Sequence, residues 1–146
     1  MFIGNIEVKG LARLAPMAGI SNAAYRIVAR ECGSALTTSE EIDATGLTRK
    51  NSKTRYDIAK YLPEEKPIAL QLLGSNVETL VPGAQWLQDR GADIIDLNMG
   101  CPVPKITKTG RGSAMMKDVK KTAEILKAMR KVITVPFTIK IRSGWD

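Results

Sequence analysis

A cysteine follows an apolar run in a segment that would hold its side chain on an extended backbone. Residues 98–102 read Asn-Met-Gly-Cys-Pro. Pro102 disfavours a helical conformation of Cys101, and Gly100 lets the backbone approach a flat ligand closely. Because the chain has no histidine to generate a thiolate, the thiol fits a general acid better than a nucleophile. A free thiol, with a pKa of about 8.5, is largely protonated at neutral pH. The alternative is a small buried core residue, the commonest fate of free cysteine.

The absence of histidine excludes several classes of site. Ser-His-Asp triads, Cys-His dyads and HExxH zinc sites all require it, and we expect no metal site. Cys32 and Cys101 are the only cysteines, which excludes a disulfide scaffold and favours a reducing, cytoplasmic location. No apolar run approaches the about 18 residues of a membrane span. Residues 1–10 lack the basic and apolar regions of a signal peptide.

Two polar residues interrupt apolar runs. Gln71 lies within Ile-Ala-Leu-Gln-Leu-Leu, and Lys140 lies within Phe-Thr-Ile-Lys-Ile. Such groups need partners when they are buried, since an unsatisfied buried polar group costs about 1–3 kcal/mol. Either they form an interior pair, for example Lys140 with Asp96, or both point at a polar heterocycle. Together with the Cys101 segment they favour a ligand site.

The positive charge is concentrated in the last third of the chain. The net charge of residues 1–100 is −1, whereas that of residues 101–146 is +8. Residues 105–111 form a basic loop followed by Gly112 and Ser113, without the spacing of a Walker A loop. A basic surface beside a ligand site favours nucleic acid as a partner, with phosphate contacts supplying affinity. The alternative is a solvated helix face.

Apolar runs alternate with amphipathic stretches along the chain. Repeated βα units predict a parallel sheet, either doubly wound or closed as a barrel. The length of 146 residues is typical of one domain, whereas a (β/α)₈ barrel takes about 250 residues. No hairpin is expected between strands. The predicted strands are 11–17, 35–38, 67–73, 92–98 and 137–141; the predicted helices are 22–32, one opening near 75 and ending at 90, and one beginning at 118; residues 41–62 are predicted as a long loop with some helix near 56–62.

Three helix starts are predicted from capping residues. Ser21 is the expected cap of the first helix, and Asp118 that of the last. Ser75 and Glu78 form a capping box for the middle helix. Pro82 conflicts with that start, because it lacks an N–H and clashes with the preceding turn, so the helix either kinks there or begins later.

Several motifs together resemble the tRNA-dihydrouridine synthases, particularly their bacterial B-type branch. The resemblance covers essentially the whole chain. An Asn-Met-Gly-Cys-Pro segment followed at this separation by Lys-Ile-Arg-x-Gly-Trp-Asp is highly specific, whereas Ala-Pro-Met-Ala-Gly is shared more widely with flavin barrels. The motifs are residues 14–20, Tyr25-Arg26, residues 71–75, residues 91–102, residues 110–113 and residues 139–146.

The resemblance implies an FMN-binding (β/α)₈ TIM barrel, incomplete here with about five of eight strands, and NADPH as the electron donor. The substrate implied is a uridine of tRNA, reduced by hydride transfer from FMN to C6. Cys101 would donate the proton to C5, and Asn98 would hold the uracil. The remaining implied contacts are Pro16, Met17, Ala18, Gln71 and Lys140 with the flavin, and Lys105, Lys108, Arg111 and Arg142 with substrate and RNA.

The sequence departs from the family pattern in places. Glu41 stands where a Met commonly follows Ser39 and Glu40, and Pro104 stands where a Lys is common. Residues 1–146 would form the amino-terminal portion of the barrel, without its later strands or the helical RNA-binding domain. A second polypeptide or self-association would then complete the barrel. The alternatives are a non-catalytic half-barrel that oligomerises or binds RNA, and a flavin barrel that acts on a free pyrimidine.

Overall fold

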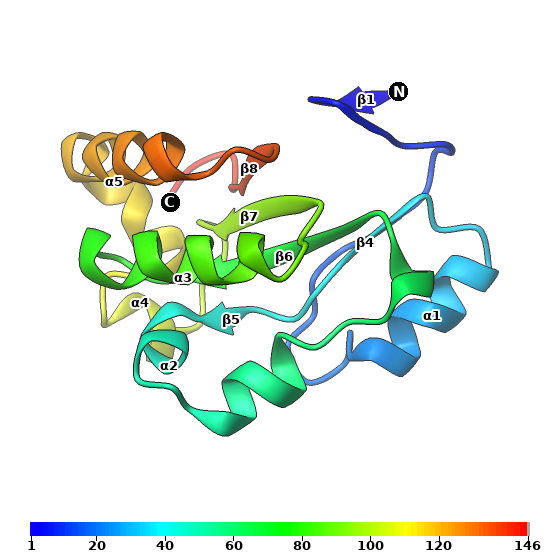
Figure 1. Cartoon of the computed structure of the whole chain (residues 1–146). Helices are drawn as coiled ribbons and strands as arrows, with labels where there is room; N and C mark the ends of the chain where they lie inside the picture. Colours follow the sequence, from blue (N-terminus) through cyan, green and yellow to red (C-terminus); the bar gives the residue numbers. More distant parts are fainter. Residues whose placement is uncertain (146) are drawn as a thin grey trace.

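The computed structural model describes residues 1–145, so Asp146 of the Gly-Trp-Asp motif lies outside the described residues. Its centre is a sheet of parallel strands that follow one another in chain order (Figure 1). A further short strand, β5, pairs with the end of β6. In order across the sheet the strands are β3 (Arg13–Leu14), β4 (Leu36–Thr38), β6 (Ile68–Leu73), β7 (Ile94–Asn98) and β8 (Phe137–Lys140), and β5 is Ile42–Asp43.

The strand order decides between the two predicted architectures. A doubly wound sheet reverses its strand order at a switch point, whereas a barrel adds each strand beside the one before it. The described strands advance in one direction from β3 to β8. The fold is therefore a curled parallel half-barrel, which confirms the incomplete (β/α)₈ barrel.

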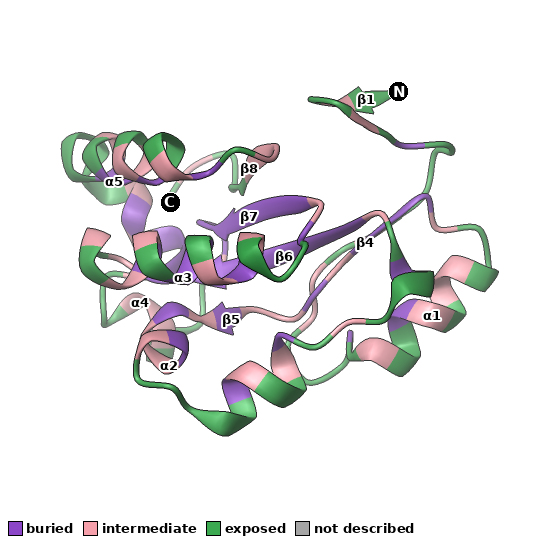
Figure 2. Ribbon diagram, viewed as in Figure 1, coloured by how far each residue is buried: buried purple, intermediate pink, exposed green. Residues whose placement is uncertain are grey.

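Helices cover the outer face of the sheet, and the buried strands β6 and β7 lie behind them (Figure 2). All six residues of β6 are buried, as expected of a strand covered on both faces. The outer core packs strand side chains such as Leu70 and Leu97 against Leu87 and Met129 from the helices. The helices are α1 (Ala23–Glu31), α2 (Ala44–Thr48), α3 (Val77–Asp89), α4 (Pro104–Thr107) and α5 (Val119–Val132), with a π-helical turn at Thr54–Ile58 and 3₁₀ turns at Pro63–Glu65 and Gly112–Lys117.

No hairpin joins the predicted strands within the described residues, as expected, but an unpredicted hairpin precedes them at the amino terminus. Strands β1 (Phe2–Ile3) and β2 (Ile6–Glu7) pair antiparallel around Gly4, whose φ is 58°. Glycine adopts this left-handed conformation without a steric penalty. Val8, directly after the hairpin, is buried against Leu36 and Ala69. The hairpin therefore adds apolar cover at the amino-terminal end of the strands, opposite the end that carries the Cys101 segment.

Two of the predicted helix caps are displaced by one residue. Asn22 and Asn76 cap α1 and α3, and their side chains accept hydrogen bonds from the backbone N–H of Tyr25 and Thr79. Helix α3 extends from Val77 to Asp89 with Pro82 inside it, so it does not begin after the proline, and a kink at Pro82 stays a prediction. The Asp118 cap is confirmed.

The predicted long loop also contains more structure than expected. It holds β5, α2 and the π-helical turn, and the predicted basic loop contains α4. The buried side chains of Ile42, Ala44 and Leu47 attach this segment to the outer core. None of the helices within residues 1–145 has both the length and the apolar character needed to cross a membrane.

Candidate functional site

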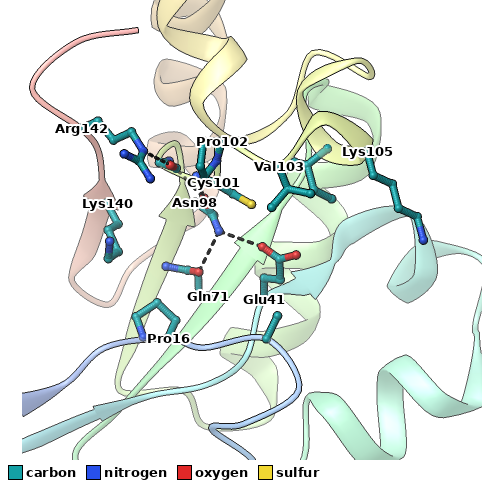
Figure 3. Close-up of a pocket in the computed structure, with 13 residues that line it drawn as sticks. Pro16, Glu41, Gln71, Asn98, Cys101, Pro102, Val103, Lys105, Lys140 and Arg142 are labelled. Atoms are coloured by element: carbon teal, nitrogen blue, oxygen red, sulfur yellow. Dashed lines mark hydrogen bonds between the residues drawn. The ribbon is translucent and has the colours of Figure 1, made fainter. Parts of the chain in front are cut away.

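A cavity of about 470 Å³ opens at the carboxyl ends of the parallel strands, where ligands bind in this architecture (Figure 3). Its wall is formed by residues of β6, β7 and β8, by the segments that follow β3, β7 and β8, and by the residue before β5. Met17, Lys108 and Arg111 are not among the lining residues, although all three were expected at the site. The lining residues are Pro16, Ala18, Glu41, Gln71, Asn98, Gly100, Cys101, Pro102, Val103, Lys105, Ile106, Lys140 and Arg142.

Asn98 lies at the centre of the cavity wall, and its amide is fully engaged. Its Oδ1 accepts hydrogen bonds from the backbone N–H of Gly100 at 3.1 Å and of Cys101 at 3.0 Å. Its Nδ2 donates to Glu41 Oε2 at 3.0 Å and to Gln71 Oε1 at 3.1 Å. Asn98 therefore fixes the turn that carries Cys101, whereas a direct contact with uracil stays a prediction.

Of the two alternatives predicted for Gln71, an interior partner or a contact with a ligand, the structure shows the interior partner. Its side chain is completely buried and donates from Nε2 to Asp96 Oδ2 at 2.6 Å. Asp96 Oδ1 accepts a further bond from Thr138 Oγ1 at 2.6 Å. Burial raises the pKa of Asp96, and the hydrogen bonds from Thr138 and Gln71 and the charge of Lys140 oppose that rise. A polar chain therefore crosses the interior face from β6 to β8.

Lys140 is exposed, which corrects the expectation of a buried ammonium. It lies on β8, the edge strand of the described sheet, with a neighbouring strand on one side only. Its partner in register is Asn98 on β7, and it lines the cavity. Within residues 1–145 it forms no ion pair with Asp96, but its charge still lowers the pKa of that carboxyl.

Cys101 lines the cavity and is only partly buried, so the buried-core interpretation is wrong. Its carbonyl oxygen accepts bonds from the backbone N–H of Ser113 at 3.0 Å and from the Ser113 hydroxyl at 3.1 Å. A Cβ at Gly112, whose φ is 61°, would lie 2.5 Å from that carbonyl oxygen. The Gly112-Ser113 pair therefore supports the cysteine turn.

The structure also explains why residue 100 is a glycine. A Cβ built there would lie 3.4 Å from the carbonyl oxygen of Lys140. The absence of a side chain at Gly100 therefore leaves room for the backbone of β8, and not only for a ligand. Arg142 Nε donates to the carbonyl oxygen of Gly100 at 2.6 Å, which ties the chain after β8 to the cysteine turn.

The basic residues predicted to contact RNA differ in whether their side chains are already bonded within the protein. Lys105 and Lys108 are exposed. Arg111 is partly buried and is engaged by Asp43 Oδ2 at 3.0 Å and by Thr109 Oγ1 at 2.7 Å. Asp43 also caps α2 through the backbone N–H of Thr45 at 2.8 Å. Arg111 therefore holds the basic loop against α2, and an RNA contact from it stays a prediction.

A buried ion pair positions the segment after β3. Arg26 is 1% exposed and Glu65 is fully buried. Arg26 Nη1 donates to the carbonyl oxygen of Ser21 at 2.7 Å. The Ser21 hydroxyl accepts from the backbone N–H of Met17 at 2.9 Å and donates to its carbonyl oxygen at 3.1 Å. Arg26 and Ser21 thus fix the turn between Pro16 and Ser21, which contributes to the cavity wall.

Sequence reasoning missed Glu41 as a site residue and noted it only as a departure from the family pattern. Its half-buried carboxylate lines the cavity and accepts the bond from Asn98. Burial raises the pKa of Glu41, the charge of Arg111 lowers it, and the charge of Asp43 raises it. The available signal was its place shortly after the strand at 35–38, where parallel α/β folds put ligand contacts.

Comparison with known proteins points to one family. A family model described as dihydrouridine synthase (Dus) matches residues 13–146. The chain is 37% identical over 148 residues to tRNA-dihydrouridine synthase B of Xanthomonas axonopodis. It is 37% identical over 144 residues to the protein of that name from Pseudomonas aeruginosa, and 34% identical over 144 residues to a probable tRNA-dihydrouridine synthase of Rickettsia typhi. These matches cover 99–100% of this chain but only 43–44% of each relative.

Proposed function

Because the chain belongs to the dihydrouridine synthase family, we propose that it takes part in the reduction of uridine to 5,6-dihydrouridine in tRNA. In this proposal residues 1–146 are the amino-terminal portion of an FMN-binding barrel. The names of the relatives support tRNA as the substrate. The observation that carries the proposal is the thiol of Cys101 in a cavity walled by Gln71 and Asn98 at the carboxyl ends of the strands.

The cavity residues fit a flat, polar cofactor ring. Pro16, Ala18 and Ile106 offer apolar surface, whereas the Lys140 ammonium lies on the opposite side of Asn98 from Glu41 (Figure 3). We assign Pro16, Ala18, Gln71 and Lys140 to the ring, with Met17 supporting the same turn. When bound, FMN supplies the hydride, and NADPH restores its electrons. The positive charge of Lys140 would stabilise negative charge on the ring.

The proposed part of Cys101 is that of a general acid. Reduction converts the C5=C6 double bond of uracil into a single bond, with a hydride added at C6 and a proton at C5. The cavity contains one thiol, and its backbone is held by a hydrogen bond from Ser113 to the carbonyl oxygen of Cys101 and one from the Cys101 N–H to Asn98. After it gives its proton to C5, the thiolate regains a proton from water.

Exposed lysines support a tRNA partner. Lys105 lies at the rim of the cavity, and Lys108 follows one turn later on the same short helical segment. Phosphate contacts of this kind bring a nucleic acid to the site without reading its sequence. We propose Lys105 and Lys108 as backbone contacts, with Arg142 and Arg111 chiefly holding the protein segments that present the site.

The test is the formation of dihydrouridine in tRNA by Cys101→Ala, with FMN and NADPH supplied. We expect a loss of at least about 100-fold in kcat, the contribution typical of a positioned general acid. Cys32→Ala is the matched control, because Cys32 is exposed and does not line the cavity. Dihydrouridine formed by Cys101→Ala at the wild-type rate would refute the role given to this thiol.

A further inference from the structure

Glu41 brings a carboxylate into the wall of an otherwise basic cavity. Its Oε2 accepts the hydrogen bond from Asn98 at 3.0 Å. Within the described residues, Oε1 has no hydrogen-bond partner. In Figure 3 the carboxylate lies toward the cavity, between Asn98 and Val103. One acceptor atom is therefore left for a ligand.

Donors flank this acceptor. Lys105 lines the cavity from α4, and Lys140 lines it from β8. The strand order places Glu41, just before β5, and Lys140 on opposite sides of Gln71 and Asn98. The other charged groups nearest the carboxylate are Arg111, which faces it from the basic loop, and Asp43, from β5. The cavity thus presents an acceptor between donors.

A uracil ring has the complementary edge. Its O2, N3–H and O4 present an acceptor, a donor and an acceptor in that order. A cytosine ring presents a lone pair at N3 and an amino group at C4. A carboxylate accepts hydrogen bonds and repels a lone pair. An acceptor at the position of Glu41 Oε1 therefore distinguishes the two pyrimidines.

We propose that Glu41 is a specificity-determining residue whose free Oε1 accepts the N3–H of the uracil ring. This inference rests on the proposed function and names the residue that selects its base. An isoalloxazine ring carries the same imide edge, so the flavin is a second source of the same chemistry. We assign Glu41 to the substrate because it lies on the Cys101 side of Asn98, whereas Lys140 lies on the other (Figure 3).

The test compares Glu41→Gln with the wild type. In the variant the side-chain oxygen still accepts from Asn98, so the support of the cysteine turn is kept. The amide nitrogen then points into the cavity as a donor. Binding of fluorescently labelled pentauridylate and pentacytidylate is measured by anisotropy, with FMN present. The quantity compared is the ratio of the two dissociation constants. Glu78→Gln is the control, since Glu78 is exposed on α3 and loses the same charge.

We expect the wild type to prefer pentauridylate and Glu41→Gln to lose at least about tenfold of that preference, the effect of losing a charge-assisted hydrogen bond. Glu78→Gln should keep the wild-type ratio. An unchanged ratio in Glu41→Gln would overturn the inference, because it is the result expected of a residue that only supports Asn98. A wild type with no preference, or with no binding of either pentanucleotide, would overturn it as well.

Two further measurements on the same proteins separate the alternatives. If Glu41→Gln weakens FMN binding and leaves the pentanucleotide ratio unchanged, the carboxylate faces the flavin and the inference is wrong. Dihydrouridine formation in tRNA is measured in parallel. A uridine preference that depends on Glu41 without dihydrouridine formation supports the inference and contradicts the proposed function. Dihydrouridine formation without a uridine preference that depends on Glu41 contradicts the inference alone.

Discussion

Replacing Asn98 by aspartate reverses the polarity of one atom at the centre of the cavity wall. The new carboxylate keeps the oxygen that accepts from Gly100 and Cys101. It loses the Nδ2 group that donates to Glu41 and Gln71. Two hydrogen bonds of about 1 kcal/mol each are removed, and two acceptors now face a negatively charged oxygen. We expect Asn98→Asp to lower the free energy of unfolding by about 2–4 kcal/mol at pH 8.

The cost should depend on pH. The backbone N–H groups of Gly100 and Cys101 lower the pKa of the introduced carboxyl, whereas burial and the two acceptors that face its other oxygen, on Glu41 and Gln71, raise it. We expect the rise to be the larger effect, so that the pKa lies above its value in the unfolded chain. Its protonated form regains one O–H donor. Because the folded protein then binds the proton more tightly than the unfolded chain, the deficit grows as pH rises through the raised pKa and shrinks as pH falls. The variant should therefore be closer to the wild type at pH 5 than at pH 8.

The assay is chemical denaturation of both proteins at pH 5 and pH 8. Asn76→Asp is the control with the same chemical change, because Asn76 caps α3 by accepting from Thr79 and aspartate caps a helix equally well. That control should stay within about 0.5 kcal/mol of the wild type. Asn98→Asp with wild-type stability at pH 8, or with a deficit that is the same at both pH values, would refute the hydrogen-bond assignment of Asn98.

Three further predictions address stability and RNA binding. Arg26→Met and Glu65→Leu should each cost about 3–5 kcal/mol in denaturation experiments, because each leaves the other charge buried and unpaired; the double variant should cost less than their sum. Because burial raises the pKa of Asp96 above its ordinary value of 3.8, this carboxyl lowers the free energy of unfolding as the pH rises from 3.8 through the raised pKa. Asp96→Asn should therefore flatten the dependence of stability on pH across that window, as measured by denaturation. Lys105→Ala combined with Lys108→Ala should weaken tRNA binding and reduce the slope of log affinity against log salt by about one for each lysine that binds a phosphate; an unchanged slope would exclude both lysines as phosphate ligands.

Much of the barrel could be predicted because its strands are apolar and its helices amphipathic. The buried strand at 67–73 is an example, since all six residues of β6 are buried. The missed elements are short and lie among polar residues. Strand β5 has two residues and α2 has five, so both are too short for a repeating apolar pattern to be recognised. The amino-terminal hairpin was missed although its Gly4-Asn5 pair is a turn signal.

Both displaced caps follow the same pattern. In Ser21-Asn22 and in Ser75-Asn76 either residue type can cap a helix, and in each pair the asparagine does so. The two serine hydroxyls form other hydrogen bonds. The Ser21 hydroxyl bonds Met17, and the Ser75 hydroxyl donates to the carbonyl oxygen of Thr109. The Ser21 contact is local, whereas the Ser75 contact joins segments 34 residues apart, which local sequence does not reveal.

The site shows the same division. Gln71 was identifiable because a polar residue interrupts an apolar run, and its interior partner is Asp96. The prediction that Lys140 is buried was wrong, because periodicity does not reveal that β8 is an edge strand in the described sheet. Glu41 was missed because its importance comes from Asn98, which is 57 residues away in sequence. Contacts of this range follow from the curvature of the sheet, which no local pattern encodes.

The polar contacts at the cavity form one continuous chain. It runs from Thr138 through Asp96, Gln71 and Asn98 to Glu41, and so joins β8, β7 and β6 to the residue before β5. Each acceptor polarises the next donor in a partly water-free environment, so the links strengthen one another. Breaking any link leaves its buried neighbour unsatisfied. Single substitutions along the chain should therefore be strongly non-additive, and the positions of Cys101 and Glu41 should be coupled although no hydrogen bond joins them directly.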